Sequence, residues 1–547
     1  MKRIIKIVVA IIFLPLIALI IALIGLYLSA DMMLPELYVN RANYPTRQVQ
    51  DTLYCNDSYL LQNRYGTWEI YLEGSRQERG AEQGALTQSL MRYQEDVFIE
   101  QIKRIVPSDS YLKFLRLFLI IFNRDIAQHI DLEYREEIAA MSLFCTDEYN
   151  AIGTPYERQL NYHAAHDIGH TMQQYMLVGC SSFASWGGSS YDGELLVARN
   201  FDFYVGDDFA KNKIITFAAP DEGYRYASVG WAGMVGVLSG INQRGLTVTI
   251  NAAQGSVPIS AKTPISILTR EILQYASTID EAYEIACRRE TFVNESILIG
   301  SQRDGCAAII EKTPDETAIY YSDCQQIIST NHYQSERLRG RDYNVENIAN
   351  SDSQYRYDRL QELLSQYQRV DYNGAAAILR DRYGRGGEDI GVGNEMTLNQ
   401  SIANHSVIFA PAASLMWVST TQWQSGVMAC YDLSGFFAGS SKPMLLDDRS
   451  IAADTLFIER DLTRLLKYRE SIAEINRAIG EGDTLSRSYI DEFMRQNPKH
   501  YYTYRILGDY YMNIDKHEAK SLYERSLKCA IPYKSERNEI IEIIEGL

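Results

Sequence analysis

The chain of 547 residues contains 46% apolar and 22% charged residues, a balance typical of a globular protein with a large buried core. Its formal net charge of −17 opposes binding to a phosphate backbone, so we expect no nucleic-acid partner. The eight cysteines show neither a CxxC pair nor the spacing of a zinc ribbon, so the sequence predicts no structural zinc site.

The first predicted element is a membrane-spanning helix within residues 1–30. An almost uninterrupted apolar run, residues 7–28, is long enough to cross the hydrocarbon core of a bilayer. Cleaved signal peptides have shorter apolar stretches of roughly 7–15 residues. Small residues after the run leave cleavage after Ala30 as the alternative. Because basic residues precede the run, the positive-inside rule predicts a membrane-anchored protein whose remaining chain is extracytoplasmic, either periplasmic or extracellular.

The next part of the chain divides into a linker and a pro-segment. Residues 31–60 contain prolines and several asparagines, and we interpret them as the linker. Residues 61–179 open with a predicted strand at 67–72. Apolar residues then recur at helical spacing within 82–93 and 111–122. The pro-segment is therefore expected to be mostly helical.

From Cys180 onward, short β-prone segments alternate with Gly, Asn and Asp turns. The predicted strands are residues 195–198, 214–218, 232–238, 246–250, 307–310, 318–321, 326–329, 406–410, 415–420 and 426–432. Two helical blocks, near residues 264–289 and 353–381, interrupt them. Runs of strands that alternate with paired helices predict a layered α+β domain over residues 180–445.

The last segment, residues 446–547, is predicted to be helical. A pattern resembling one tetratricopeptide repeat is formed by Tyr504, Leu507, Gly508, Tyr511, Ala519, Tyr523, Ser526 and Pro532. Such repeats bury their apolar faces against neighbouring repeats, so a single one favours an accessory cap over a peptide-binding array. A protein contact through these helices stays open.

The junction Gly179-Cys180 is the candidate catalytic feature. Cleavage before Cys180 would free an α-amine with an ordinary pKa of about 8, and this amine can accept the thiol proton. The thiolate is the nucleophilic form of cysteine. A strand–turn–strand follows and would return Arg199 and Asp202 beside Cys180. A guanidinium favours the thiolate and a carboxylate can orient the amine, so both residue types suit these roles.

Cys180 followed by Arg199-Asn200-x-Asp202 resembles a block of the choloylglycine hydrolase, acid ceramidase and acyl-coenzyme A:6-aminopenicillanic acid acyltransferase families. A Gly-Cys junction behind a long helical pro-segment is most similar to the last of these, a group of autoproteolytic N-terminal-nucleophile enzymes. Further blocks similar to this family, in its order, lie at residues 72–84, 240–251, 308–311, 329–333 and 353–359. The resemblance spans about residues 65–435.

The resemblance implies a four-layer αββα sandwich of the N-terminal-nucleophile type that needs no cofactor and no metal. Cys180 would be the nucleophile with its own amine as the base, and Asp202 and Arg199 would organise it. The implied reaction is hydrolysis of a linear amide, either a non-peptide or an acyl-amino amide, through a thioester acyl-enzyme. An acyltransferase with the same intermediate and a non-enzymatic membrane-anchored scaffold are the alternatives. The expected partner is a small-molecule amide or acyl substrate.

The resemblance also implies roles for residues farther along the chain. Asn331 would donate to the oxyanion, and Asn251 would share that role. Arg356 would close the pocket, with Arg359 as its rival.

A histidine cluster offers a different hypothesis. His163, His166 and His170 share one face of a predicted helix, a spacing that could hold zinc or iron. No second cluster of His and Asp follows in the sequence, so we favour a polar helix that leads to the junction.

Overall fold

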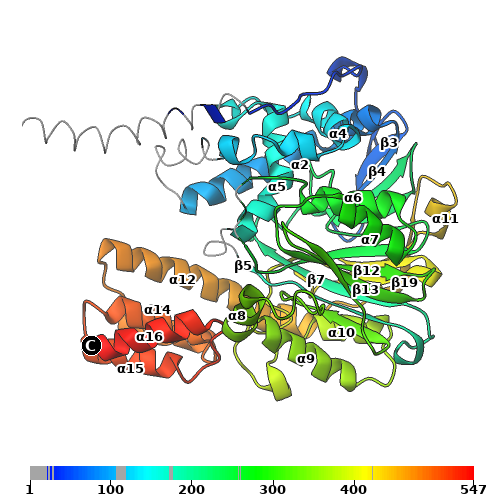
Figure 1. The fold of residues 1–547 in the computed structure, drawn as a ribbon. Coiled ribbons are helices and arrows are strands. Elements are labelled where there is room, and N and C mark those ends of the chain that lie inside the picture. The colour runs from blue at the N-terminus through cyan, green and yellow to red at the C-terminus, as the bar shows by residue number, and fades with distance from the viewer. Residues whose placement is uncertain are drawn as a thin grey trace, which may run out of the picture.

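The computed structural model describes residues 21, 25–26, 30–105, 117, 119–171, 177–256, 258, 260–421 and 423–547 (Figure 1). Most of the predicted anchor within residues 1–30 and most of the predicted helix at 111–122 lie outside these residues. Within the described part of the chain, no helix combines the length and the apolar character needed to span a membrane.

Two β-sheets form the centre of the molecule. The first has the strand order β1 (Arg47–Val49), β2 (Thr52–Cys55), β3 (Ser58–Gln62), β4 (Trp68–Gly74), β8 (Ile214–Pro220), β9 (Tyr226–Gly230), β10 (Ser239–Asn242), β11 (Leu246–Ala252), β12 (Glu295–Ser301), β13 (Cys306–Lys312) and β14 (Thr317–Tyr320). The second has the order β15 (Gln326–Ser329), β6 (Ser181–Ser185), β7 (Leu196–Tyr204), β16 (Ala403–Ala410), β17 (Leu415–Ser419), β18 (Met428–Asp432) and β19 (Met444–Ile451). The short β5 (Leu177–Val178) pairs with β7. Among the described ladders, only that of β4 and β8 is parallel.

Helices cover the outer face of each sheet, which gives a mixed α and β fold in four layers (Figure 1). The helices over the first sheet are α2 (Arg76–Ile105), α4 (Leu132–Ser142), α5 (Pro155–Thr171), α6 (Ile265–Tyr275) and α7 (Ile279–Arg288). Those over the second are α9 (Ser353–Ser365) and α10 (Tyr372–Leu379), with α8 (Asp342–Asn350) beside α9. A further apolar cluster fills the space between the sheets. Central strands are thus buried on both faces, which explains their nearly continuous apolar runs.

The pro-segment is part of the first sheet rather than a separate cover. Strands β1 and β2 and the start of β3 lie within residues 31–60, so the prediction of a linker there is wrong. The turn between β2 and β3 contains Asn56 with a φ of 51°, a conformation that Asn tolerates well. The turn residues that suggested a linker therefore mark a hairpin. The predicted strand at 67–72 is confirmed as β4, which joins this hairpin to β8.

Most predicted strands are confirmed, with one clear error at residues 232–238. This segment is an irregular connection between β9 and β10. Its apolar side chains are buried because the segment packs beneath α6, where the Val237 N–H donates to the Ser266 carbonyl (2.8 Å). Gly233, with a φ of 85°, interrupts an extended course. An apolar run therefore predicted burial correctly and strand geometry wrongly.

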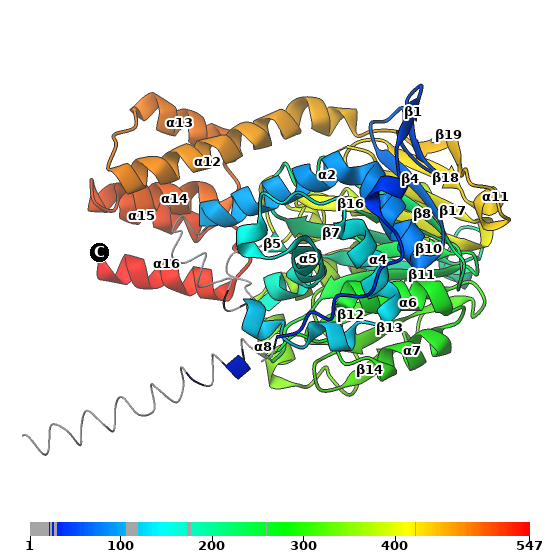
Figure 2. The same cartoon turned by 90° about the horizontal axis from the view of Figure 1, so that it is seen from above.

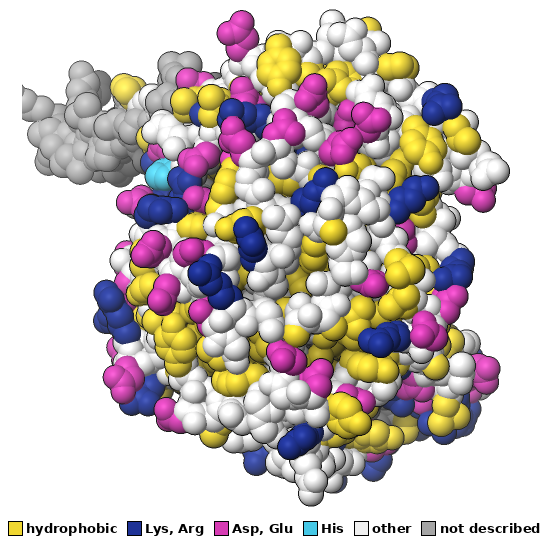
Figure 3. Space-filling view, turned by 90° about the vertical axis from the view of Figure 1, so that its right-hand side faces the viewer, with side chains coloured by type: hydrophobic (Ala, Val, Ile, Leu, Met, Phe, Trp, Pro, Cys, Tyr) yellow, Lys and Arg dark blue, Asp and Glu magenta, His cyan; other side chains and the backbone are white. Residues whose placement is uncertain are grey.

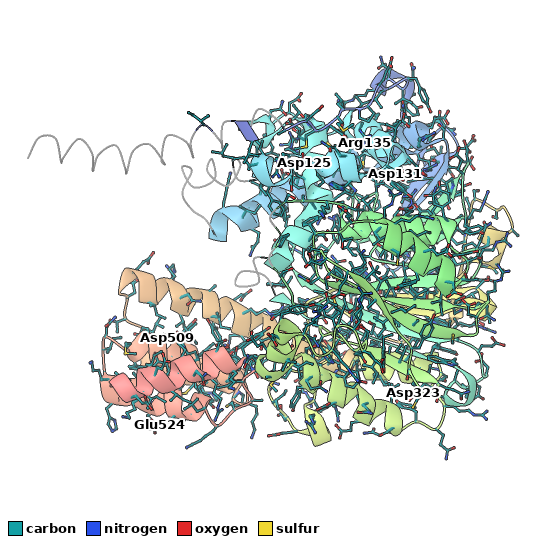
Figure 4. All side chains as sticks on the ribbon, viewed as in Figure 1. Asp125, Asp131, Arg135, Asp323, Asp509 and Glu524 are labelled. Atoms are coloured by element: carbon teal, nitrogen blue, oxygen red, sulfur yellow. The ribbon has the colours of Figure 1, made fainter. Side chains whose placement is uncertain are left out.

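The C-terminal helices are α12 (Thr463–Glu481), α13 (Arg487–Gln496), α14 (Tyr501–Tyr511), α15 (Lys516–Ser526) and α16 (Lys534–Gly546). The helix pair suggested by the repeat-like pattern is confirmed as α14 and α15. A Cβ at Gly508 would lie 2.6 Å from the Tyr523 ring, so glycine permits their close approach. The Tyr523 hydroxyl donates to Asp509 (2.6 Å), which Figure 4 labels on this extension.

The extension packs beside the sheets through residues 391–401 (Figure 2). The Val392 N–H donates to Asn497 Oδ1 (3.2 Å), and Asn497 Nδ2 donates to the Val392 carbonyl (2.9 Å). Arg469 on α12 donates to the Ser401 carbonyl (3.0 Å). On the side of the molecule away from these helices, acidic and basic side chains are interspersed (Figure 3).

Candidate active site

The junction Gly179–Cys180 lies in a continuous antiparallel ladder. Strands β5 and β6, on either side of the junction, pair with the same strand β7 in one register. The Gly179 N–H donates to the Asp202 carbonyl (3.2 Å), and the register places Cys180 opposite Phe201. The Cys180 side chain is only 1% exposed. The ladder therefore fixes the junction directly beside Asp202, as the strand–turn–strand interpretation predicted.

Arg199 lies beside the thiol on the face of β7 that points toward the first sheet. Its Nη2 donates to Cys180 Sγ (3.5 Å) and to the Ile250 carbonyl, and its Nη1 donates to the Leu238 carbonyl (2.8 Å) and to Ser239 Oγ (2.5 Å). Burial raises the pKa of the Cys180 thiol, and the charge of Arg199 opposes this rise. Arg199 thus favours the thiolate at a site where burial disfavours it.

Asp202 lies on the opposite face of β7, because successive side chains of a strand alternate. It is fully buried, and neither carboxylate oxygen has a hydrogen-bond partner among the described residues. Burial raises the pKa of Asp202 to about 8, although the nearby charges of Arg356 and Arg199 oppose the shift. A buried carboxyl without a donor is costly, so this position calls for a partner.

Arg356 on α9 holds the junction from the side of Asp202. It donates to the carbonyls of Gly179 (3.3 Å) and Cys180 (2.7 Å), to Ser181 Oγ (2.9 Å), to Asn331 Oδ1 (2.6 Å) and to Asp352 (2.8 Å). One of these acceptors is the carbonyl oxygen of the bond whose cleavage we predict. Arg356 is therefore placed to stabilise negative charge on that oxygen.

The rival arginine is held elsewhere. Arg359, one turn later on α9, forms ion pairs with Asp381 (2.9 Å) and Glu362 (2.9 Å). The structure thus separates the two candidates: Arg356 contacts the junction, and the contacts of Arg359 anchor α9.

The two predicted asparagines lie in neighbouring sets of hydrogen bonds, with Asn251 buried and Asn331 half-buried. The Asn331 Nδ2 donates to the Ala252 carbonyl (2.8 Å), while its oxygen accepts from the arginine at the junction. The Asn251 Nδ2 donates to the carbonyls of Ser329 (2.8 Å) and Thr330 (3.2 Å). Both protons of the Asn251 amide are thereby engaged, so its contacts position the Asn331 segment, whereas Asn331 retains one amide proton.

Two functional features were missed in the sequence. Asp352 anchors Arg356, and the spacing i to i+4 of an acid and a base on a predicted helix could have indicated it. The second is a half-open pocket between α2, α5 and the connection after β9, whose empty space, open solvent included, is about 590 Å³. Its apolar lining includes Met91, Phe98, Phe203, Phe209, Trp231 and Met234. Nothing local in the sequence unites these residues.

The pocket lies along the same face of β7 as Arg199. Phe201 and Phe203 follow Arg199 at two-residue intervals, and their rings stack with centroids 5.7 Å apart. Phe203 stacks in turn on Trp231 (6.1 Å). A row of side chains therefore leads from Arg199, which donates to Cys180, to the pocket.

His163 is the member of the histidine cluster whose side chain the structure describes, and its hydrogen bonds are to backbone groups. Its Nδ1 lies 2.7 Å from the Gln159 carbonyl, and its Nε2 accepts the Val235 N–H (2.9 Å), so the ring is neutral and has both nitrogens engaged. Burial lowers the pKa of His163 to about 4. The side chains of His166 and His170 lie outside the described part of the chain, within which no group of three ligands could hold a metal ion.

A model of a known family matches part of the chain. The family model described as "Acyl-coenzyme A:6-aminopenicillanic acid acyl-transferase" matches residues 189–422, which confirms the predicted resemblance over this segment. The match begins after Cys180 and includes Arg199, Asp202, Asn331 and Arg356. An uncharacterized protein of Archaeoglobus fulgidus is 22% identical over 462 residues, covering 74% of this chain and 75% of the relative.

Solved structures also align with part of the chain. The Caenorhabditis elegans ortholog of N-acylethanolamine-hydrolyzing acid amidase is 16% identical, with a TM-score of 0.31, and covers 42% of this chain and 93% of its own. A mutant conjugated bile acid hydrolase of Clostridium perfringens is 11% identical, with a TM-score of 0.34. The alignment covers 49% of this chain and 96% of the hydrolase. The penicillin V acylase of Agrobacterium tumefaciens is 13% identical, with a TM-score of 0.29. The alignment covers 44% of this chain and 82% of the acylase.

Proposed function

We propose that the protein is an N-terminal-nucleophile enzyme that cleaves its own chain between Gly179 and Cys180 and then uses Cys180 to hydrolyse linear amides. The observation that carries the proposal is the carboxyl of Asp202, fully buried, without a hydrogen-bond donor and paired through its backbone with Gly179. Cleavage would create an amine at this position. The uncut chain thus holds a binding partner for a group that only cleavage supplies.

The cleavage step uses the contacts around the junction. The Cys180 sulfur attacks the carbonyl carbon of Gly179, the C–N bond breaks, and the thiol proton ends on the Cys180 nitrogen. The charged donor Arg356, 3.3 Å from the Gly179 oxygen, stabilises the oxyanion that forms. Water then hydrolyses the thioester, leaving a carboxylate on Gly179 and a free amine and thiol on Cys180.

In turnover, the freed amine of Cys180 accepts the thiol proton while Asp202 orients it and Arg199 stabilises the thiolate. The sulfur attacks the substrate amide, and Asn331 donates its remaining amide proton to the oxyanion. The ammonium gives its proton to the leaving amine. Water resolves the thioester, and the acid is released.

The pocket supports a substrate whose acyl part is apolar. Its aromatic lining begins at Phe203, four residues along β7 from Arg199, which is about 13 Å at the usual strand rise. In this proposal the acyl carbonyl lies at Cys180 and the end of the acyl chain near Trp231, with Phe201, which is buried in the uncut chain, between them. Burial of apolar area would supply the binding free energy.

Acyl transfer is the second candidate, because the matched family is named as an acyl-transferase. Both activities share the thioester and differ in whether water or an amine accepts the acyl group.

We also propose that the protein is anchored through the apolar run at residues 7–28, with the enzyme on the extracytoplasmic side. A pure scaffold would not require the buried constellation around Cys180.

The test is to incubate purified protein with a panel of N-acylated amines of increasing chain length, with and without an added acceptor amine. Mass spectrometry should detect free acid, or the exchanged amide if transfer dominates. Cys180→Ala should abolish either product, while Cys287→Ala, at an exposed cysteine, should leave product formation unchanged. Equal turnover by wild type and Cys180→Ala would reject the proposal.

A further inference from the structure

Behind Arg199, a buried hydrogen-bonded chain leads away from Cys180. Arg199 Nη1 donates to Ser239 Oγ (2.5 Å), which lies 2.8 Å from His405 Nε2. His405 Nδ1 in turn lies 3.1 Å from Asn404 Oδ1. The four side chains come from β7, β10 and β16, and all are fully buried. Neither Ser239 nor His405 belongs to the residues assigned a role above.

The proton positions in this chain follow from the capacity of each group. A guanidinium only donates, so Ser239 Oγ accepts from Arg199. With Asn404 Oδ1 beside Nδ1, the tautomer that completes the chain carries the ring proton on Nδ1, and Nε2 then accepts the Ser239 hydroxyl proton. His405 is then neutral, with its proton on Nδ1 directed at Asn404. Burial lowers the pKa of His405 well below its ordinary value, and the charges of Arg199 and Lys213 add to this effect. The neutral ring therefore persists as an acceptor.

We propose that His405 is a positioning residue: through Ser239 it fixes the Arg199 guanidinium against the sulfur of Cys180. The inference rests on the proposed function, in which Cys180 reacts as a thiolate. With His405 as its acceptor, the Ser239 hydroxyl directs a lone pair at Arg199. Without that acceptor, the hydroxyl proton is free to rotate and the guanidinium loses a defined contact.

The charge state of Arg199 explains why a neutral pair is suited to this task. In the described structure, the two terminal nitrogens of Arg199 donate to three neutral oxygens and to Cys180, and to no carboxylate. A carboxylate partner would hold the guanidinium and also offset the charge that favours the thiolate. A serine and a neutral histidine orient Arg199 while leaving its charge directed at Cys180.

Packing alone is the competing explanation, because the His405 ring also contacts Phe201 (5.1 Å between centroids), over which Arg199 lies at 4.3 Å. His405→Phe keeps an aromatic ring at this place and removes the acceptor. Ser239→Ala removes the link and leaves His405 unchanged, whereas Ser239→Thr restores the hydroxyl. These variants distinguish a His405 that positions Arg199 through its hydrogen bond from a His405 whose ring only fills space.

The experiment measures the rate of Cys180 alkylation by iodoacetamide against pH in the processed protein, with the site identified by mass spectrometry. We expect the midpoint of the profile to rise by about one pH unit in His405→Phe and Ser239→Ala, which makes alkylation about tenfold slower below the midpoint. Ser239→Thr should restore the wild-type midpoint. The other titratable groups that face Cys180 are its own freed α-amine, Asp202 and Glu295, and they are the same in every variant.

The control is Ser406→Ala, since Ser406 is adjacent to His405 on β16 but donates to Asn200 on the opposite face of the sheet (2.7 Å). This variant should keep the wild-type midpoint. Should His405→Phe fail to fold, the comparison of Ser239→Ala with Ser239→Thr decides. Wild-type midpoints in both His405→Phe and Ser239→Ala would overturn the inference. A wild-type chain that is never cleaved would instead overturn the proposed function.

Discussion

The two faces of strand β7 carry two buried ionisable groups in opposite situations. On the face toward the first sheet, both terminal nitrogens of Arg199 are hydrogen-bonded, one of them to Cys180. On the face toward α9, neither oxygen of Asp202 has a donor among the described residues. Both side chains are fully buried, so exposure to solvent does not explain the difference.

On the Arg199 face, both terminal nitrogens of the guanidinium are engaged in the uncut chain and Nε alone has no partner among the described residues, whereas on the other face both oxygens of Asp202 await a partner. The surroundings that favour the thiolate are assembled from protein groups alone. The carboxyl that would orient the amine is buried at a cost, and this cost would be relieved when cleavage frees the amine. In this account, self-cleavage is the step that completes the Asp202 face.

The largest effect is expected at Arg356, which contacts the junction on the Asp202 face. Arg356→Met removes a charged donor from the oxygen of the scissile bond, so cleavage should slow by about two to three orders of magnitude. The rate is measured as conversion of uncut chain to fragments on denaturing gels. Arg359→Met, one turn along the same helix, is the matched control and should be cleaved normally. Equal rates in the two variants would remove Arg356 from the mechanism.

The next effect concerns Asp202 after cleavage. Asp202→Asn keeps the size of the side chain and removes its charge, so acyl-enzyme formation in processed protein should fall by about two orders of magnitude. Single-turnover acylation by an activated ester measures this step, with thermal melting as the check on folding. Normal acylation at an unchanged melting temperature would show that Asp202 has no catalytic role.

The uncut chain offers a stability test of the same carboxyl. The pKa of Asp202 is about 8 in the folded chain and 3.8 ordinarily, so the folded state holds its proton after the unfolded state has lost it. The stability due to this group is therefore full below pH 3.8 and is lost as the pH rises to about 8, at about 1.4 kcal/mol per pH unit. Melting of Cys180→Ala is compared with melting of Cys180→Ala/Asp202→Asn.

We expect the double variant to gain in melting temperature relative to the single variant as the pH rises from 5 to 8. Titration of all other groups cancels in this comparison. In cleaved protein the difference in melting temperature should have the opposite sign, so that Asp202→Asn melts lower. The reason is that Asp202 then pairs with an ammonium group and Asn would weaken that contact. A difference that does not vary with pH in the uncut pair would contradict the assignment of an unpartnered carboxyl.

The smallest effect is expected on the Arg199 face, at the pocket. Trp231→Ala removes a ring that stacks on Phe203, so KM should rise about tenfold for amides with long apolar acyl groups and little for short ones. Steady-state kinetics across chain lengths measures this. A uniform change for all chain lengths would place the acyl group elsewhere.

Much of the fold could be predicted where short-range patterns coincide with geometry. Turn residues and alternating apolar runs identified β7, β11 and β15, and the Gly-Cys junction with its Arg-Asn-x-Asp block located the centre of the candidate site. The segment at 232–238 was wrongly predicted to be a strand, because burial under a helix and burial in a sheet select the same apolar side chains. The linker at 31–60 misled because turn residues occur both in linkers and in tight hairpins.

The remaining features of the site depend on contacts between distant parts of the chain. The resemblance favours Arg356 over Arg359, but their different contacts depend on the position of α9 against β6. The engagement of Asn251 with backbone carbonyls is likewise set by the approach of β11 to the end of β15. The pocket draws residues from α2, α5 and β7, which no local pattern unites.

The most direct test of the central claim is N-terminal sequencing and intact mass analysis of the purified protein. The account predicts two fragments that stay together, because β4 of the pro-segment pairs with β8 of the following domain. The second fragment should begin Cys-Ser-Ser-Phe, the residues that start at Cys180. Cys180→Ala should give one uncut chain. A fully active protein in which the Gly179–Cys180 bond is intact would contradict the account.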